Sequence, residues 1–449
     1  MNRYQRELFY KQSAKQDFLL SKTDVRPEDG KSKSTVSNDV KNALLKTFPG
    51  FLCAQSFMER ALSNLDTAVT FGAMVIQIDN SISRDRGTRK LNSVARHTQV
   101  AKTIDRICQS ENSLWGLVEC DLFGCFFAEK DAAFCRKLGQ RLKQNLTKQR
   151  TATVSIGIAA YPTIHFKKDQ IFENARKALD HAAFFGPDSL VVFDAVSLNI
   201  SGDKLYDKGN IKDAANEFKT ALLLDPSNVN IRNSLGVCYG VMDELDKALS
   251  EFKKAINLNP KEVMSVYNAG LVNMLKGEKN KALEYLLDAI RLDKESFEIS
   301  FQTGRVYLDL KKPENAKNYL EKATRLRPDS GPAFTSLGEC YAAMGLKDKA
   351  VAALKKAVKQ NSDNAAALSA LGWLFASLGE NLEIATIFCQ QSVDIAPDNG
   401  LFRHRLGRLY LKENQLEDAL TQFKEATKLG YDSSRYIAQI EEKHISKAS

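Results

Sequence analysis

The sequence has little histidine and no closely spaced cysteine pair, and both features limit the chemistry open to the chain. Its five histidines lie far apart, outside any P-loop, nucleophile-elbow or HExxH context. Its eight cysteines form no CxxC pair, and no histidine stands at zinc-ligand spacing from them. We therefore expect reduced, mostly buried thiols, no metal site and no bound cofactor.

Long apolar runs are lacking as well. The longest, such as GAMVIQI at residues 72–78, are far too short to span a bilayer. The first 20 residues contain no continuous apolar segment behind their charges, as a signal peptide would require. The expectation is a cytoplasmic protein without membrane insertion.

Positive charge is unevenly distributed along the chain. Residues 1–194 contain 29 Lys and Arg against 21 Asp and Glu, whereas the remainder, within a formal total of +9, is nearly balanced. This excess could favour an anionic ligand, a nucleotide or an acidic partner. No run of Lys and Arg interleaved with aromatic residues indicates a nucleic-acid groove, so we expect a solvated basic surface and no nucleic-acid partner.

A 34-residue period dominates the second half of the sequence. Glycine recurs at this spacing, with a final interval of 35, at Gly202, Gly236, Gly270, Gly304, Gly338, Gly372 and Gly407. Small residues follow at Ala214, Ala248, Ala282, Ala316, Ala350, Ala385 and Ala419, and again at Ala221, Ala255, Ala289, Ala323, Ala357, Ser392 and Ala426. Between them stand Phe218, Phe252, Leu286, Leu320, Leu354, Cys389 and Phe423. Because antiparallel helices approach closely only at small side chains, the pattern predicts stacked helix pairs.

This pattern resembles the tetratricopeptide repeat (TPR), with seven units over residues 195–433. Proline closes several units because it cannot continue a helix. The resemblance implies an all-α, right-handed superhelix whose first helices line a concave groove. Residues 434–449 are expected to form a polar helix that caps the array.

The resemblance also places a partner-binding surface in the groove. Its expected residues are Tyr267, Leu271, Met274, Phe301, Arg305, Leu308, Trp373, His404, Arg408 and Lys412. The family's carboxylate clamp is incomplete, because Asn199 and Asn233 lack the accompanying lysine. An amphipathic or apolar peptide anchored by Tyr267 and Phe301 is favoured. The alternative is that Leu271, Met274 and Leu308 pack only against neighbouring repeats.

The periodicity is different between residues 46 and 194. Short β-like runs at residues 73–79, 114–128, 151–161 and 189–194 alternate with helical patterns. Strands alternating with helices, together with one hairpin, predict an α/β sandwich followed by the α-solenoid.

Three segments of this region resemble the GGDEF domain of diguanylate cyclases, a nucleotide-cyclase-like fold. They are FPGFLCAQSF at 48–57, TVSIGIAAYP at 153–162 and the closing NARKALDHAAFFGPDSLVVFD. On that pattern Glu119, Cys120, Asp121, Leu122 and Phe123 occupy the GGDEF signature. The family's two glycines let backbone approach phosphate, and its acids hold the bridging metal ions.

The resemblance implies a domain that has lost this activity. Glu119 and Cys120 replace the glycines, and Gln77 with Asp79 replaces the family's Asp-x-Asp pair. The positions that contact substrate are changed as well, at Cys53, Ala54, Ala183 and Pro187, and the product-inhibition motif would fall at Ser110 and Ser113. We expect no catalysis. Weak nucleotide binding through Asp79, Asp121 and the Arg84, Arg86, Arg89 and Lys90 cluster is the alternative to an exposed loop.

Residues 1–45 are expected to contain a segment that forms one amphipathic helix, followed by a flexible polar linker. The segment either docks on a partner or on the groove, or is a loosely ordered extension. The whole chain then reads as a bacterial-type signalling or assembly adaptor with a protein or peptide partner. Its degenerate domain would serve in docking, homodimerisation or sensing. The rivals are an effector that responds to cyclic di-GMP or GTP, and a divergent nucleotide cyclase.

Overall fold

The computed structural model describes Phe18 and residues 38–79, 89–119, 121–149, 152–379 and 381–448. The chain divides into two compact units within one helix. The first unit is Ser21–Cys238, and the second combines Met1–Leu20 with Tyr239–Ser449. Residues on both sides of the expected 194/195 boundary belong to the first unit, and that domain boundary stays a prediction.

A six-stranded mixed sheet forms the centre of the first unit, in the order β1-β3-β4-β2-β5-β6. The elements before the repeats are α2 (Asn38–Thr47), β1 (Leu52–Cys53), α3 (Ala54–Leu65), β2 (Phe71–Ile78), α4 (Arg89–Ser110), β3 (Leu114–Glu119), β4 (Leu122–Ala128), α5 (Ala132–Gln149), β5 (Val154–Tyr161), η1 (Lys168–Gln170), α6 (Ile171–Ala182), η2 (Ala183–Phe185) and β6 (Leu190–Val192). The outer pairs β1–β3 and β5–β6 are parallel, and the inner pairs are antiparallel. All four expected β-like runs contain strands.

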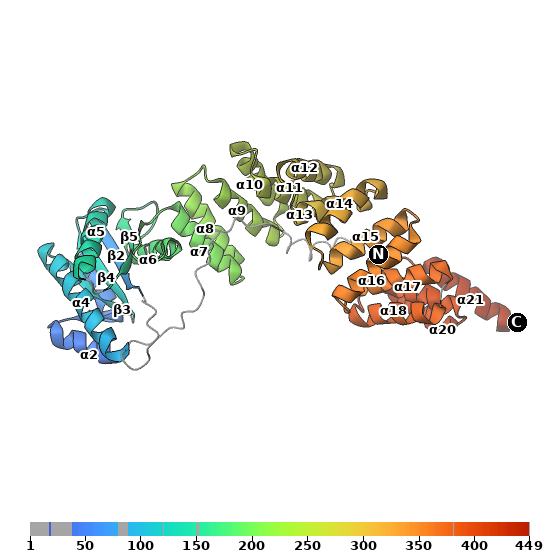
Figure 1. The fold of residues 1–449 in the computed structure, drawn as a ribbon, viewed down its shortest axis with the longest axis horizontal. Coiled ribbons are helices and arrows are strands. Elements are labelled where there is room, and N and C mark those ends of the chain that lie inside the picture. The colour runs from blue at the N-terminus through green and yellow to red at the C-terminus, as the bar shows by residue number, and fades with distance from the viewer. Residues whose placement is uncertain are drawn as a thin grey trace. The chain divides into compact units, whose positions relative to one another are not determined.

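Helices cover both faces of this sheet because its central strands are apolar on both sides. On one face, α2, α4 and α5 pack over Met74, Ile76 and Phe123. On the other, α3 and α6 pack over Val75 and Phe126. Figure 1 shows the sheet between α4 and α5 on one side and α6 on the other. The predicted α/β sandwich is confirmed as an α/β region with a mixed sheet.

The chain passes from the sheet into the repeats without a linker. Phe193 follows β6 and donates its N–H to the carbonyl of Ile158, and Asp194 then caps α7 (Ala195–Asp207) by accepting from the Ser197 N–H at 2.8 Å. The α6 and α7 helices pack together, and Lys177 pairs with Glu217 of α8 (Ile211–Leu224) at 2.6 Å. The first helix pair is therefore part of the same compact unit as the sheet.

The predicted helix pairs continue through the rest of the chain. They are α9 (Val229–Val241), α10 (Leu245–Leu258), α11 (Val263–Leu275), α12 (Lys279–Leu292), α13 (Phe297–Asp309), α14 (Pro313–Leu326), α15 (Gly331–Ala343), α16 (Lys347–Gln360), α17 (Ala365–Leu378), α18 (Leu382–Ile395), α19 (Gly400–Lys412) and α20 (Leu416–Lys428), followed by α21 (Ser434–Ala448). The periodic small residues and the large residues between them are all buried. Among the described helices, none is long and apolar enough to cross a membrane.

The N-terminal extension and the cysteine thiols can be compared with their expected states. The extension expected over residues 1–45 ends in α2, whose Val40 and Leu44 are buried in the core of the α/β region. The seven cysteines in the described residues are free thiols, and all except Cys53 are buried. Residue Cys120, the Arg84 and Arg86 part of the basic cluster, and Glu380 at the repeat insertion lie outside the described residues.

Candidate functional site

The expected signature lies at the turn between β3 and β4, where its acids are engaged by other side chains. The carboxylate of Asp121 lies 2.7 Å from Nε2 of His97, a histidine of α4 that is 1% exposed. Glu119, the last residue of β3, pairs with Arg176 of α6 at 2.8 Å. Both carboxylates therefore tie the hairpin to the helices on either face of the sheet.

The acid at the end of β2 has a similar role. Oδ1 of Asp79 accepts a hydrogen bond from the hydroxyl of Ser155 at 2.7 Å, and Oδ2 accepts the backbone N–H of Asp188 at 2.8 Å. Asp79 thus joins the end of β2 to β5 and to the loop before β6. Gln77 stands opposite Leu122 in the β2–β4 register.

The remaining signature residues belong to the core. Leu122 is 6% exposed and Phe123 is fully buried. Within the described ranges, no group of three His, Cys, Asp or Glu side chains is placed to hold a metal ion. Asp79, Asp121 and Glu119 therefore lie at the same end of strands β2, β3 and β4. Each of these acids contacts a side chain of another element of the α/β region.

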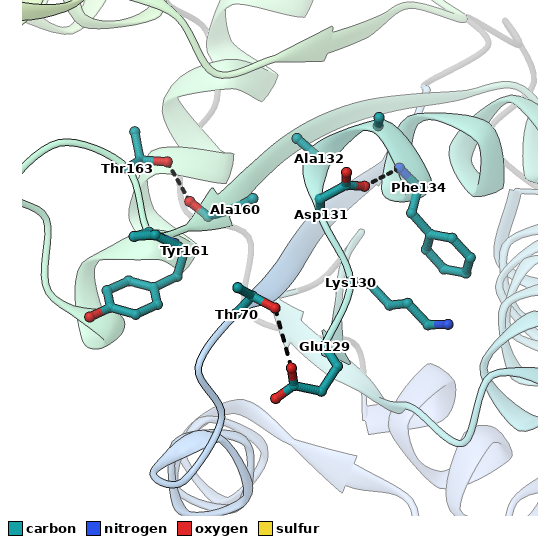
Figure 2. A pocket seen from close by; sticks show the side chains of 11 residues that line it. Thr70, Glu129, Lys130, Asp131, Ala132, Phe134, Ala160, Tyr161 and Thr163 are labelled. Atoms are coloured by element: carbon teal, nitrogen blue, oxygen red, sulfur yellow. Dashed lines mark hydrogen bonds between the residues drawn. The ribbon is translucent and has the colours of Figure 1, made fainter.

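A surface pocket lies at the other end of the same strands. Its lining includes Thr70 just before β2, Glu129 just after β4 and Tyr161 at the end of β5 (Figure 2). Glu129 accepts from the Val69 N–H at 3.3 Å, and Asp131 accepts from the Phe134 N–H at 2.7 Å at the start of α5. The acids of this pocket thus stabilise turns, and the pocket is distinct from the signature corner.

In the second unit, the expected groove residues belong to the first helices α11, α13, α17 and α19 of their repeats. We call the side of these helices that carries their partly buried or exposed members the first-helix face; these members are Met274, Phe301, Arg305, Leu308, Trp373, Arg408 and Lys412. Tyr267 and Leu271 of α11 are fully buried, so neither is offered to a partner in this structure. Met274, Phe301 and Leu308 are partly buried. Of the two expected anchors, Phe301 is the accessible one, and the Arg305 guanidinium lies 5.4 Å from its ring centroid.

The C-terminal end of this face gathers aromatic and basic side chains from three helices. The guanidinium of Arg408 in α19 lies 4.3 Å from the ring centroid of Trp373 in α17 and 5.4 Å from that of Tyr436 in α21. Nζ of Lys412 donates to the carbonyl of Ala376 at 2.9 Å. We call Trp373, Arg408 and Tyr436 the aromatic–arginine cluster.

His404 lies beside this cluster but faces inward. Its Nδ1 is 2.8 Å from the Ser433 hydroxyl, and its ring contacts Tyr431, Tyr436 and Phe423. Burial, with the charges of Arg408 and Arg405, lowers the pKa of His404 to about 4. The imidazole is therefore neutral at pH 7 and belongs to the packing of α19 on α20 and α21 rather than to a basic surface.

Two neighbours of this end were not among the expected site residues. Arg405 donates to the hydroxyl of buried Ser369 at 3.1 Å, and burial lowers the pKa of Arg405. Tyr436 comes from the helix expected to be only a polar cap. Its signal in the sequence is the apolar spacing of Tyr436, Ile437 and Ile440, which predicts one packed face on that helix.

Comparison with known proteins gives a consistent picture of the repeats. Models described as tetratricopeptide repeat or TPR repeat match residues 202–241, 229–262, 265–296 and 307–374. No curated protein matches the chain.

Similar solved structures cover nearly their own full length but only part of this chain. A tetratricopeptide repeat protein from Parabacteroides merdae is 18% identical, with 55% of this chain and 96% of that chain covered and a TM-score of 0.45. MamA is 30% identical, with 36% and 96% covered and a TM-score of 0.34. YrrB, described as a TPR protein with an unusual peptide-binding site, is 25% identical, with 42% and 96% covered and a TM-score of 0.37. From the family matches and the buried periodic residues together, the chain carries tetratricopeptide repeats between residues 202 and 374.

Proposed function

We propose that this chain is a non-catalytic signalling or assembly adaptor that binds a protein or peptide on the first-helix face of its repeats. The α/β region, which resembles a degenerate GGDEF domain, would serve as a docking, dimerising or sensing module. Tetratricopeptide repeats are consistent with protein–protein interaction or peptide binding. The binding surface and the role of the α/β region are argued below from residues of this chain.

The observation that carries the proposal is the aromatic–arginine cluster on the repeats. A guanidinium that lies over an aromatic face can still donate its N–H groups to a carboxylate. Tryptophan, tyrosine and arginine are also the residue types that dominate interface energetics. The expected partner is therefore a segment that combines an acidic side chain with an apolar or aromatic one.

The hydrogen bonds of the signature corner support the non-catalytic part. A metal-bridged triphosphate would need carboxylates free to coordinate the ions. Asp79 already accepts from Ser155 and Asp188, and Asp121 is paired with His97. Recruiting either acid for a metal would break contacts that hold β2 and the β3–β4 turn in place.

Partner capture by purified full-length protein tests the binding surface. Proteins from the native host should be retained by the wild type and reduced at least about tenfold by Trp373→Ala or Arg408→Ala, as expected for interface hot spots. Arg291→Ala is the matched control, since this arginine lies exposed on the second helix α12, where it pairs with Asp288 at 2.6 Å. Equal capture by all four proteins would contradict binding on the first-helix face.

Incubation with nucleotides tests the non-catalytic part separately. The full-length protein with GTP or ATP and Mg²⁺ or Mn²⁺ should form no cyclic dinucleotide. Product formation that is lost on Asp79→Asn would establish the divergent-cyclase alternative instead. The effector alternative would be established by two results together: cyclic di-GMP or GTP binds the protein in calorimetry, and the same nucleotide changes the amount of partner captured.

A further inference from the structure

The aromatic ring of Phe18 is buried against the repeats although this residue precedes the α/β region in the sequence. Phe18 is 8% exposed and belongs to the same compact unit as Tyr239–Ser449. Its ring stacks on Phe252 of α10, with centroids 6.3 Å apart and planes inclined by 25°. The other side of the contact is Gly240 of α9.

Gly240 makes room for this ring. A Cβ at residue 240 would lie 2.6 Å from Cζ and 2.8 Å from Cε2 of Phe18, closer than real side chains approach each other. Gly240 stands four residues after the glycine of its repeat. At this position the other repeats carry Tyr206, Met274, Leu308, Ala342, Ala376 and Leu411. The second repeat therefore has no side chain at this position, and the ring of Phe18 lies in the space left there.

We propose that Gly240 and Phe252 form a seat for an aromatic side chain, and that Phe18 of the same chain is its resident occupant. This inference deepens the proposed binding function and rests on it. A partner segment that presents phenylalanine to this part of the first helices would have to displace Phe18. The N-terminal segment would then act as an internal competitor of the partner.

Phe18 competes from within the same chain as its seat. Its binding is therefore intramolecular, and effective concentrations for such binding are on the order of millimolar. A free peptide supplied at micromolar concentration therefore competes poorly for a seat that the chain fills itself.

Binding of a fluorescent peptide with the sequence of residues 10–25 to the full-length protein tests the seat by anisotropy. The Phe18→Ala protein should bind this peptide at least about tenfold more tightly than the wild type, because the internal competitor is gone. The double variant Phe18→Ala/Gly240→Leu should lose that binding. Phe18→Ala/Ala342→Leu places the same leucine at the equivalent position of another repeat and should retain it.

Three results would overturn the seat: equal peptide affinity for wild type and Phe18→Ala, no peptide binding to Phe18→Ala, or binding that survives Gly240→Leu. Gly240→Ala keeps the test decisive if the leucine variant fails to fold, since a single methyl group should already weaken peptide binding. Circular dichroism at 222 nm separates loss of the seat from loss of helix. Failure here would leave partner capture through Trp373 and Arg408 untouched, and loss of that capture would leave the peptide result standing.

Discussion

At the scale of single residues, the two acids of the β3–β4 corner differ in how deeply their partners are buried. Asp121 is paired with a histidine that is 1% exposed, whereas Glu119 and its partner Arg176 are 57% and 35% exposed in their side chains. A polar group buried in the core costs free energy when its partner is removed, but an exposed ion pair contributes little. The two acids, two positions apart, should therefore differ in their effect on stability.

Asp121→Ala should destabilise the α/β region by about 1–3 kcal/mol, because it leaves the buried imidazole of His97 without this carboxylate. Glu119→Ala is the matched control and should change stability by less than about 1 kcal/mol. Amide hydrogen exchange of β3 and β4 in the full-length protein measures both. Equal protection in the two variants would show that the Asp121–His97 contact does not stabilise the fold more than the Glu119–Arg176 pair does.

The pKa of His404 predicts a pH dependence at the C-terminal end of the repeats. Its folded-state pKa of about 4 lies below the ordinary value of 6.5. The unfolded state therefore binds the proton more readily, and the stability from neutral His404 is present above pH 6.5 and is lost as pH falls toward 4. The loss should reach roughly 3 kcal/mol at the acid end.

Amide exchange of α19 and α21 at pH values from 7 to 4 should accordingly accelerate, after correction for intrinsic rates. His404→Gln keeps a hydrogen-bonding group near Ser433 but does not titrate, so its exchange should depend less on pH. Identical pH dependence in wild type and variant would assign the effect to other groups, such as Asp432.

At the scale of elements, the contact between β5 and α6 depends on one residue without a side chain. A Cβ at Gly157 would lie 2.0 Å from the carbonyl oxygen of Ala175 and 2.3 Å from the backbone nitrogen of Leu179. These neighbours are helix backbone and cannot rotate away. Glycine is therefore required where α6 lies directly on the strand.

Gly157→Ala should lower the free energy of unfolding of the α/β region by about 1–3 kcal/mol, because α6 must move off the sheet. The melting temperature should fall accordingly. Gly139→Ala is the control, since its Cβ would meet chiefly the Cδ1 methyl of Leu190 at 2.7 Å, the far end of a flexible side chain. Unchanged melting of Gly157→Ala would mean that α6 has more freedom than the structure shows.

Much of this element structure could be predicted from the sequence. The small and large residues repeat every 34 positions, and each helix pair must bury the same pattern, so the periodicity is explicit. Five of the six sheet strands could be predicted within about three residues, as with residues 73–79 for β2 (Phe71–Ile78), whereas the two-residue β1 (Leu52–Cys53) lies outside the expected runs. The start of α2 could not, because its first apolar residue, Val40, directly follows a polar stretch.

The candidate site was less predictable than the fold. Periodicity assigns Tyr267 and Leu271 to a face of their helix but does not say how much of each side chain is covered. The aromatic–arginine cluster depends on Tyr436, which lies beyond the last repeat. The seat of Phe18 joins residues that are more than 200 positions apart, and no local pattern encodes such a contact.

At the scale of the whole molecule, the chain consists of two compact units that contain different features. The α/β region and the first repeat helices form one compact unit joined through Asp194 and the Lys177–Glu217 pair. The later repeats carry the aromatic–arginine cluster and the seat of Phe18. The central claim is that a partner binds on the first-helix face of those later repeats.

Amide hydrogen exchange of the full-length protein, with and without a captured and purified partner, tests this claim most directly. Binding on the first-helix face predicts slower exchange in α13, α17 and α19 when the partner is present, with little change in the second helices α12, α14 and α18. Protection confined to those second helices, or to the strands of the α/β region, would contradict it.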